Sequence, residues 1–524
     1  MMAAGETWHE RWRGAAIALF ALVTSAVFVY RQGMAEPDAV VMAAGMAMGM
    51  GANGDFSDAL LYGRHLSPGM YFIVRALYPL FFDFPAHMMG FLNGLSIVCF
   101  AGLAWLLYRL FRASMTPTAA TAALLILVTT PLVWEAGTSF HPLIPATFLL
   151  AASALAWRRY DAPRPRVAWL VASALMAALA LVIRVEIVWV MPAALTAVLA
   201  RPGRARRVVA LCAVFVVAGV VYAAVLQLTA GERAPAQSLR NYASLIHGMY
   251  ASSFSLRSLT RTGTWMVLGM GAATLAAVAY VLLRFLETRR RSAGDEARTT
   301  TARVIIALVW ILPAVLFWLP QPTPILRHYF VSTIGLAWLA GCLVPHAWSA
   351  RRVYLVALAV VAVNLALPEA GYRLYNRAHP EAPKTANGAF FYYHQQIETR
   401  ITRQRDMARA VIDEMFAAGS PGAFAQVDWE GYAYVVYALY TRAPDAERIT
   451  GMHPAPHTTY YVYRSEGAEL RLMQTVGLAR GIGKDAVATA ATQATADGLP
   501  LFLSRDALLA GIDPAALGPG VVVY

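Results

Sequence analysis

Asp38 is the first residue of the chain whose type and position could do chemistry. It follows the first apolar segment in the sequence Glu36-Pro37-Asp38-Ala39. A carboxylate at the mouth of a cavity can act as a general base that takes a proton from a hydroxyl group. A Pro-Asp pair before a helix-like run is also a common N-cap. The two roles are compatible, and the sequence leaves both open.

Two further groups combine charged and aromatic side chains beside apolar segments. Arg184 and Glu186 stand two residues apart between two short apolar runs, where they are either a functional pair or a structural ion pair at a tight turn. Arg327, His328 and Tyr329 open a late apolar run after a Pro-rich turn. A cation there could hold a phosphate, or Arg327 could snorkel to the membrane surface with Tyr329 as an interfacial aromatic residue.

His141 and Arg240 complete the set of candidate residues. His141 opens another apolar run, where a histidine is either a hydrogen-bonded structural residue or a ligand. Arg240 belongs to the basic stretch 229–262, which suits a lipid phosphate or an anionic acceptor, or is a solvated face. The sequence has no phosphate-cradling P-loop, HExxH, CxxC or GxSxG motif.

The composition is that of a membrane protein. Of 524 residues, 59% are hydrophobic and 14% are charged, whereas soluble domains have about 45–50% and about 25%. This excludes a disordered chain, a disulfide-rich secreted scaffold and an ordinary cytosolic enzyme. The net charge of +13 does not indicate nucleic acid, because basic residues of membrane proteins gather in cytoplasmic loops. Cys99, Cys212 and Cys342 fall in apolar runs and are expected to be small core residues.

Eleven apolar segments are predicted to span the membrane, since a spanning helix needs about 17–25 mostly apolar residues. They are residues 14–30, 86–108, 118–135, 141–157, 168–183, 187–200, 208–228, 263–283, 304–319, 326–344 and 353–368. With the N-terminus in the cytoplasm, the inside connections hold 20 arginines in 67 residues and the outside loops hold 8 in 103. This asymmetry is the one that the positive-inside rule requires. The candidate residues then all fall at the outer face.

The predicted organisation is a transmembrane domain, residues 1–368, followed by an extracytoplasmic α/β domain, residues 369–524. Within the first outside loop, residues 31–85, the apolar segment 69–82 is predicted to be interfacial or re-entrant. The second domain has no stretch long enough to span. A helical pattern runs over 395–417, and strand-like runs cover 432–440, 458–463 and 500–503.

The order of these motifs resembles the GT-C superfamily of integral-membrane glycosyltransferases, in the branch of lipid A aminoarabinose transferases and protein O-mannosyltransferases. In that branch a Pro-Asp-Glu motif opens the first outside loop, and here Glu36-Pro37-Asp38-Ala39 takes its place. The family's Pro-containing Tyr-Trp segment is similar to residues 67–72. Its Arg-x-Glu element before a short span and its Arg-Tyr element opening a late span are similar to residues 182–186 and 326–329.

The resemblance implies an enzyme of a bacterial inner membrane. It would move a sugar from a polyprenyl-phosphate donor to a hydroxyl of a lipid, glycan or protein acceptor, with inversion at the sugar. It implies that Asp38 is the base and that Arg327, His328, Tyr329, Arg184, Glu186, His141 and Arg240 bind substrate. Ala39 and His141 replace two acidic positions of the family, so a divalent metal ion stays an open question.

Three other functions are compatible with the sequence. A flippase for lipid-linked saccharides would favour internal repeats and broken helices near the midplane, and neither is found in the sequence. A ligase of the O-antigen type would depend on outer arginines and histidines rather than on Asp38. A non-catalytic GT-C relative would bind glycans with its outer domain.

Overall fold

The structure is a computed structural model, and the parts of the chain it describes are mainly helical. The described residues are 8–32, 69–70, 73, 76, 80, 85–138, 141–163, 165–200, 203–230, 260, 263, 269–291, 295–319, 326–345, 347–378, 422–426, 459–466, 469–477, 488, 491–492, 494–496, 498, 501–503 and 521–523.

Ten of the eleven predicted segments coincide with a helix or with two consecutive helices, and the helix Ala272–Arg291 covers only the later part of the segment 263–283. The elements are α1 (Trp8–Gln32), α4 (Pro85–Phe111), α5 (Pro117–Thr129), α6 (Pro131–Thr138), α7 (Leu143–Tyr160), α8 (Val167–Ile183), η1 (Val185–Val190), α9 (Met191–Leu199), α10 (Arg204–Ala230), α13 (Ala272–Arg291), α14 (Asp295–Trp318), η2 (Leu326–Tyr329), α15 (Phe330–Cys342) and α16 (Ala350–Ala378). By length and composition, 4 of the described helices can cross a membrane, and several others are shorter apolar helices. The prediction of a multi-pass helical membrane protein is confirmed, and the number of spans stays a prediction.

Short sequence signals fix where these helices begin and end. The Thr116 side chain caps α5 by accepting a hydrogen bond from the Ala119 N–H at 3.3 Å, and Pro117 occupies the first turn. Thr130 is extended, with ψ near 129°, because it precedes Pro131. The predicted span 118–135 is therefore divided into α5 and α6. Arg184 is likewise extended and ends α8 before the 3₁₀-helix η1.

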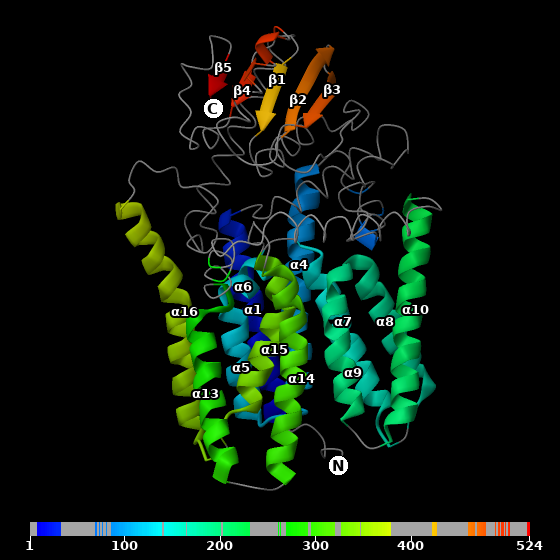
Figure 1. Ribbon diagram of the computed structural model, residues 1–524, viewed down its shortest axis with the longest axis vertical. Coiled ribbons are helices and arrows are strands. Elements are labelled where there is room, and N and C mark those ends of the chain that lie inside the picture. Colours follow the sequence, from blue (N-terminus) through cyan, green and yellow to red (C-terminus); the bar gives the residue numbers. More distant parts are fainter. Residues whose placement is uncertain are drawn as a thin grey trace. The chain divides into compact units, whose positions relative to one another are not determined.

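Consecutive helices pack as antiparallel pairs, as α7 with α8 and α14 with α15 (Figure 1). Helix α8 packs between α7 and α10, and the Ser153 hydroxyl of α7 bonds the Ser173 carbonyl oxygen of α8 at 2.8 Å. Helix α15 packs on both α14 and α5. A Cβ atom at Gly335 would lie 3.0 Å from the Trp310 ring, so glycine permits the close approach of α15 to α14. This approach matters because η1 and η2 both contact the α14–α15 pair.

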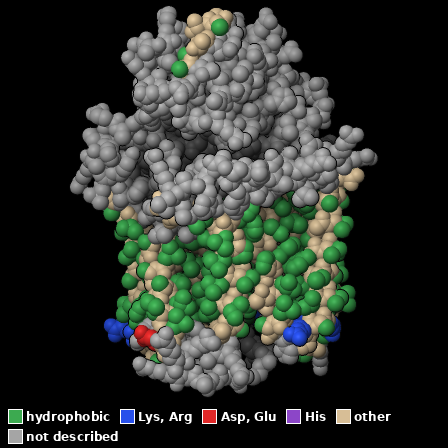
Figure 2. Space-filling model, viewed as in Figure 1, with side chains coloured by type: hydrophobic (Ala, Val, Ile, Leu, Met, Phe, Trp, Pro, Cys, Tyr) green, Lys and Arg blue, Asp and Glu red, His purple; other side chains and the backbone are tan. Residues whose placement is uncertain are grey.

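The described outer surface of the helices is apolar and ends in arginines (Figure 2). Hydrophobic side chains cover the band formed by the helices, and basic side chains gather at one end of it. Arg158 and Arg159 at the end of α7, and Arg204 and Arg206 at the start of α10, are exposed. The cysteine expectation is correct for Cys342, which is buried. It is wrong for Cys212, which is exposed because only part of the α10 surface is packed against other helices.

Contacts within the chain define two units. One comprises Met1–Phe28 and Gly94–Tyr372, and the other comprises Val29–Asn93 and Arg373–Tyr524. The boundary after Tyr372 lies four residues beyond the predicted domain boundary at residue 368, and the two-domain organisation stays a prediction.

The described part of residues 369–524 contains a five-stranded mixed sheet. Its strands are β1 (Gly422–Gln426), β2 (Thr459–Glu466), β3 (Glu469–Gly477), β4 (Leu501–Leu503) and β5 (Val521–Val523), in the order β3-β2-β1-β4-β5. β1 pairs antiparallel with β2 and β2 with β3, whereas β1–β4 and β4–β5 are parallel. The predicted strands 458–463 and 500–503 coincide with β2 and β4. The predicted strand 432–440 and helix 395–417 lie outside the described residues.

Candidate functional site

The site begins at the break between α8 and η1. Arg184 has φ −154° and ψ 116°, so the chain is extended for one residue after Ile183 before it tightens into η1. This turn brings the Arg184 side chain back over Glu186. Nε of Arg184 donates to Oε2 of Glu186 at 3.2 Å, and Nη2 donates to Oε1 at 2.8 Å. The two side chains therefore form the two-pronged arginine–carboxylate pair that only a guanidinium can make.

His328 joins this pair from a distant part of the chain. Its Nδ1 lies 2.9 Å from Oε1 of Glu186, the oxygen that also accepts from Arg184. All three residues are less than 9% exposed. A buried carboxylate is expensive to desolvate unless cations and hydrogen bonds surround it. Among the described residues, the Glu186 carboxylate faces the Arg184 guanidinium and the His328 imidazole, which together can offset its negative charge.

Three aromatic side chains, Trp189, Phe317 and Trp318, pack in series beside the His328 ring. The ring stacks on Trp318, the last residue of α14, with centroids 3.7 Å apart and planes within 3°. Phe317 contacts Trp318 edge-on at 4.9 Å between centroids, and Trp189 of η1 lies 4.9 Å from Phe317. Stacking on Trp318 fixes the plane of the imidazole ring, and the contact of Nδ1 with Glu186 fixes the rotation of the ring within that plane. His328 is thus held from two directions by residues of η1 and α14.

His141 and Tyr329 lie at the same end of the helices. His141 is 2% exposed and within electrostatic reach of Arg184, Glu186 and His328. Its Nδ1 accepts a hydrogen bond from the Leu143 N–H at 3.1 Å, which caps α7 and leaves the proton on Nε2. Among the described residues, neither His141 Nε2 nor the Tyr329 hydroxyl has a hydrogen-bond partner. Both are buried groups able to bond a polar substrate.

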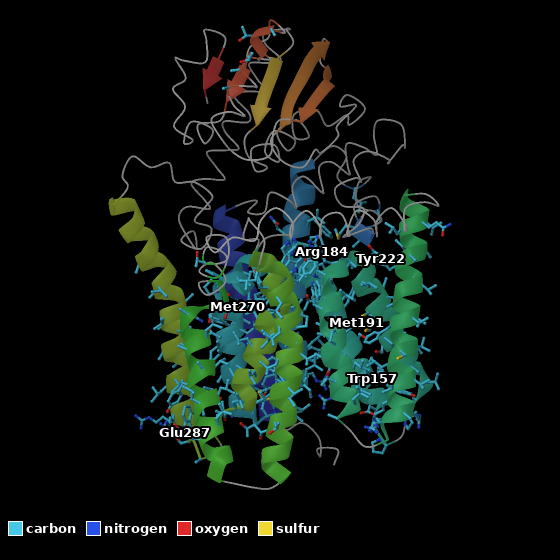
Figure 3. The ribbon with its side chains drawn as sticks, in the orientation of Figure 1. Trp157, Arg184, Met191, Tyr222, Met270 and Glu287 are labelled. Carbon is cyan, nitrogen blue, oxygen red and sulfur yellow. The ribbon has the colours of Figure 1, made fainter. Side chains whose placement is uncertain are left out.

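The cluster lies opposite the arginine-rich end. Figure 3 shows Arg184 and Tyr222 toward one end of the helices, and Trp157 and Glu287 toward the other. Trp157 precedes Arg158 and Arg159, which belong to the predicted cytoplasmic end. The cluster therefore lies at the end that the arginine asymmetry predicts to be extracytoplasmic.

Of the eight predicted site residues, the structure joins three by direct contacts and places two more nearby. Arg184, Glu186 and His328 are in contact, and His141 and Tyr329 lie at the same end. Arg327 belongs to η2, but its side chain is outside the description. Asp38 and Arg240 lie outside the described residues, so their roles stay predictions.

Trp318 is the residue that sequence reasoning missed. A tryptophan at the end of an apolar run, shortly before a Pro-rich turn, is typical of an interfacial anchor. The one signal in the sequence was that Trp318 lies just before the Pro-rich turn that leads to His328. In the structure Trp318 is 6% exposed and stacks on His328, so it supports the site instead of facing lipid.

A metal ion has no evident site in the part of the chain that the structure describes. Within those residues, no group of three or more His, Cys, Asp or Glu side chains lies close enough to hold one. The carboxylate of Glu186 already faces Arg184 and His328. The question of a metal near Asp38 stays open, because Asp38 is outside the described residues.

Comparison with known proteins gives one family and two solved structures. Residues 67–230 match the family of dolichyl-phosphate-mannose-protein mannosyltransferases. The crystal structure of ArnT from Cupriavidus metallidurans bound to undecaprenyl phosphate is 17% identical, with 83% of this chain and 75% of that chain covered and a TM-score of 0.48. Its apo state is 16% identical over the same shares, with a TM-score of 0.45. No curated protein matches the chain.

The family match bears directly on the site. Its range includes His141, Arg184 and Glu186, and it ends at the last residue of α10. The match over residues 67–230 confirms the resemblance of this chain to the GT-C superfamily of membrane glycosyltransferases.

Proposed function

We propose that the chain is a membrane glycosyltransferase that moves a sugar from a polyprenyl-phosphate donor to an acceptor hydroxyl at the extracytoplasmic face. The observation that carries the proposal is the buried cluster of Arg184, Glu186 and His328 at the end opposite the arginine-rich end. The matched family is named for a dolichyl-phosphate sugar donor and for transfer to protein. That name supports a lipid-phosphate donor here, whereas the acceptor could equally be a lipid or a glycan.

The reaction is a single displacement. The acceptor hydroxyl attacks the anomeric carbon, its proton passes to Asp38, and the bond between the anomeric carbon and the phosphate oxygen breaks. Polyprenyl phosphate leaves with the electron pair, and the sugar is inverted. Because a phosphate is already a good leaving group, no strong general acid is needed. Cations beside the phosphate stabilise the charge that develops on it, and a positioned base contributes about 10²–10⁴-fold.

The basic residues of the site have different proposed roles, some in positioning side chains and others in binding the phosphate. Nε and Nη2 of Arg184 both donate to Glu186, so Arg184 helps to hold that carboxylate in place. Glu186 in turn holds His328 at the start of α15. His328 and its neighbour Arg327 are then the phosphate-binding pair, and Arg240 assists from the outer loop. The buried polar groups of His141 and Tyr329 bond the sugar or the phosphate.

A transfer assay with the purified full chain tests the proposal. The chain is reconstituted in vesicles with a panel of radiolabelled undecaprenyl-phosphate sugars and a membrane extract as acceptor. The expected result is loss of the lipid-linked sugar together with label in a new product. Asp38→Asn should lower the rate of this transfer by about two orders of magnitude, and the matched control Asp58→Asn, in the same predicted loop, should retain it. Movement of intact donor between leaflets without a new product would indicate a flippase and overturn the proposal.

A further inference from the structure

Five exposed arginines gather at the end of α7, α8 and α10 that lies away from the candidate site. They are Arg158, Arg159, Arg166, Arg204 and Arg206. The connections 158–167 and 201–207 contain eight arginines and a single acidic residue, Asp161. Figure 2 shows basic side chains at this end of the apolar band. Because α8 packs against both α7 and α10, the charges of the three helices fall on one continuous surface.

Neighbouring groups hold this surface in a fixed arrangement. The Arg159 guanidinium lies over the Trp169 ring at 4.4 Å, and that of Arg206 lies over the Tyr160 ring at 5.7 Å. Arg207 pairs with Asp161, which neutralises the acidic residue of this surface. Ion pairing and cation–π contacts therefore orient three of the arginines. Arg158 also donates from Nη1 to the Arg109 carbonyl oxygen at 3.1 Å, and the five exposed arginines make the described part of this surface strongly basic.

Apolar tracks run directly from these arginines along two helices. On α8, Val167, Val171, Leu175 and Leu179 recur at four-residue spacing and are each more than half exposed. On α10, Val209, Val216 and Val220 are each more than 60% exposed. Because the two helices are in contact, the aliphatic stripes begin beside the charged surface that the arginines form. A headgroup at the arginines would place its acyl chains along these stripes.

We propose that the arginine surface of α7, α8 and α10 binds the headgroup of an acidic phospholipid of the same membrane. A fixed cationic surface attracts a phosphate, and the adjoining aliphatic stripes select a phosphate that carries acyl chains. A nucleic acid would use the arginines but not the stripes. The site is separate from the proposed donor site, which lies at the opposite end of the helices.

Native mass spectrometry of the delipidated full chain in neutral detergent tests this proposal. Phosphatidylglycerol and phosphatidylcholine are titrated separately, and the bound lipid is counted. Wild-type protein should bind phosphatidylglycerol more tightly, and higher salt should weaken that binding. Each basic residue near an anionic lipid surface contributes about 1 kcal/mol, so Arg204→Gln with Arg206→Gln should weaken phosphatidylglycerol binding by about 30-fold.

Two variant pairs serve as controls. Arg351→Gln with Arg352→Gln removes the same charge from the start of α16 and should leave the affinity within about twofold. Arg204→Lys with Arg206→Lys keeps the charge and should retain binding, which also keeps the test decisive if the glutamine pair fails to fold. Equal losses in the α10 and α16 glutamine pairs, or equal affinity for the two lipids, would overturn the proposal.

Discussion

Replacing Glu186 by Gln removes one negative charge from the centre of the buried cluster and changes its shape very little. Glu186 accepts two hydrogen bonds from Arg184, at 3.2 and 2.8 Å, and lies 2.9 Å from Nδ1 of His328. Glutamine keeps one carbonyl oxygen as an acceptor but turns an NH₂ group toward a cation. The Arg184 side chain is 4% exposed, so water does not replace the lost contact.

The size of the effect follows from these contacts. A hydrogen bond to a charged group contributes about 1.5–3 kcal/mol, and breaking a buried ion pair costs about 3–5 kcal/mol because one charge is left uncompensated. Since glutamine retains one acceptor, Glu186→Gln should lower the free energy of unfolding by about 3 kcal/mol, the lower end of that range. Glu186→Ala retains no acceptor and should lie at the upper end, about 5 kcal/mol.

Unfolding in a denaturant titration in detergent, followed by tryptophan fluorescence, measures these differences. Glu287→Gln is the matched control, because Glu287 is an exposed carboxylate at the opposite end of the helices (Figure 3). An exposed substitution of this kind should change the free energy of unfolding by less than about 0.5 kcal/mol. Equal effects at the two positions would show that the Arg184–Glu186 pair is not the buried pair the structure describes.

A paired substitution separates a structural role from a functional one. Arg184→Met with Glu186→Leu removes both charges, and replacing a whole buried ion pair by apolar residues is often neutral or stabilising. The double variant should therefore regain most of the stability that Glu186→Ala loses. This stable double variant should nevertheless transfer no sugar, because His328 loses its contact with the Glu186 carboxylate in η1. A double variant that is both stable and active would refute the positioning role and leave a purely structural ion pair.

The remaining predictions concern the base, the phosphate site, the aromatic support and the topology. Asp38→Asn should keep the fold, since Asn caps helices about as well as Asp, while turnover in the transfer assay falls by about two orders of magnitude; a near-normal rate would make Asp38 only a cap. Arg327→Ala should raise the donor concentration needed for half-maximal rate by about tenfold or more, and unchanged donor kinetics would favour a snorkelling arginine. Trp318→Ala should lower kcat by about tenfold through loss of the stacked His328 ring, with Trp318→Phe restoring most of it; equal activity of the two variants would argue against positioning by stacking. Reporter fusions near residues 205 and 295 should be cytoplasmic and one near 400 extracytoplasmic, and a cytoplasmic signal at 400 would contradict the topology.

The sequence alone was enough to predict where most of the helices lie, and it also predicts their direction across the membrane. Hydropathy over about 20 residues is a local property, so the segments ending at residues 183 and 228 could be predicted without any knowledge of their neighbours. The arginines beside α7 and α10 mark one end of the helices for the same reason, because charge at a membrane surface acts on each segment separately. The Arg184–Glu186 pair could also be predicted from the sequence, because the two residues are only two positions apart at a turn of the chain.

Only the tertiary structure decided which of these residues meet. Glu186 and His328 are far apart in the sequence, and they come together because η1 and η2 both pack against α14 and α15. Trp318 contacts His328 for the same reason, and no periodicity of the sequence distinguishes it from a tryptophan that faces lipid. In the C-terminal sheet, the parallel pairing of β1 with β4 and of β4 with β5 was equally hidden. Such contacts depend on the free energy of packing whole elements together, which a single sequence does not display residue by residue.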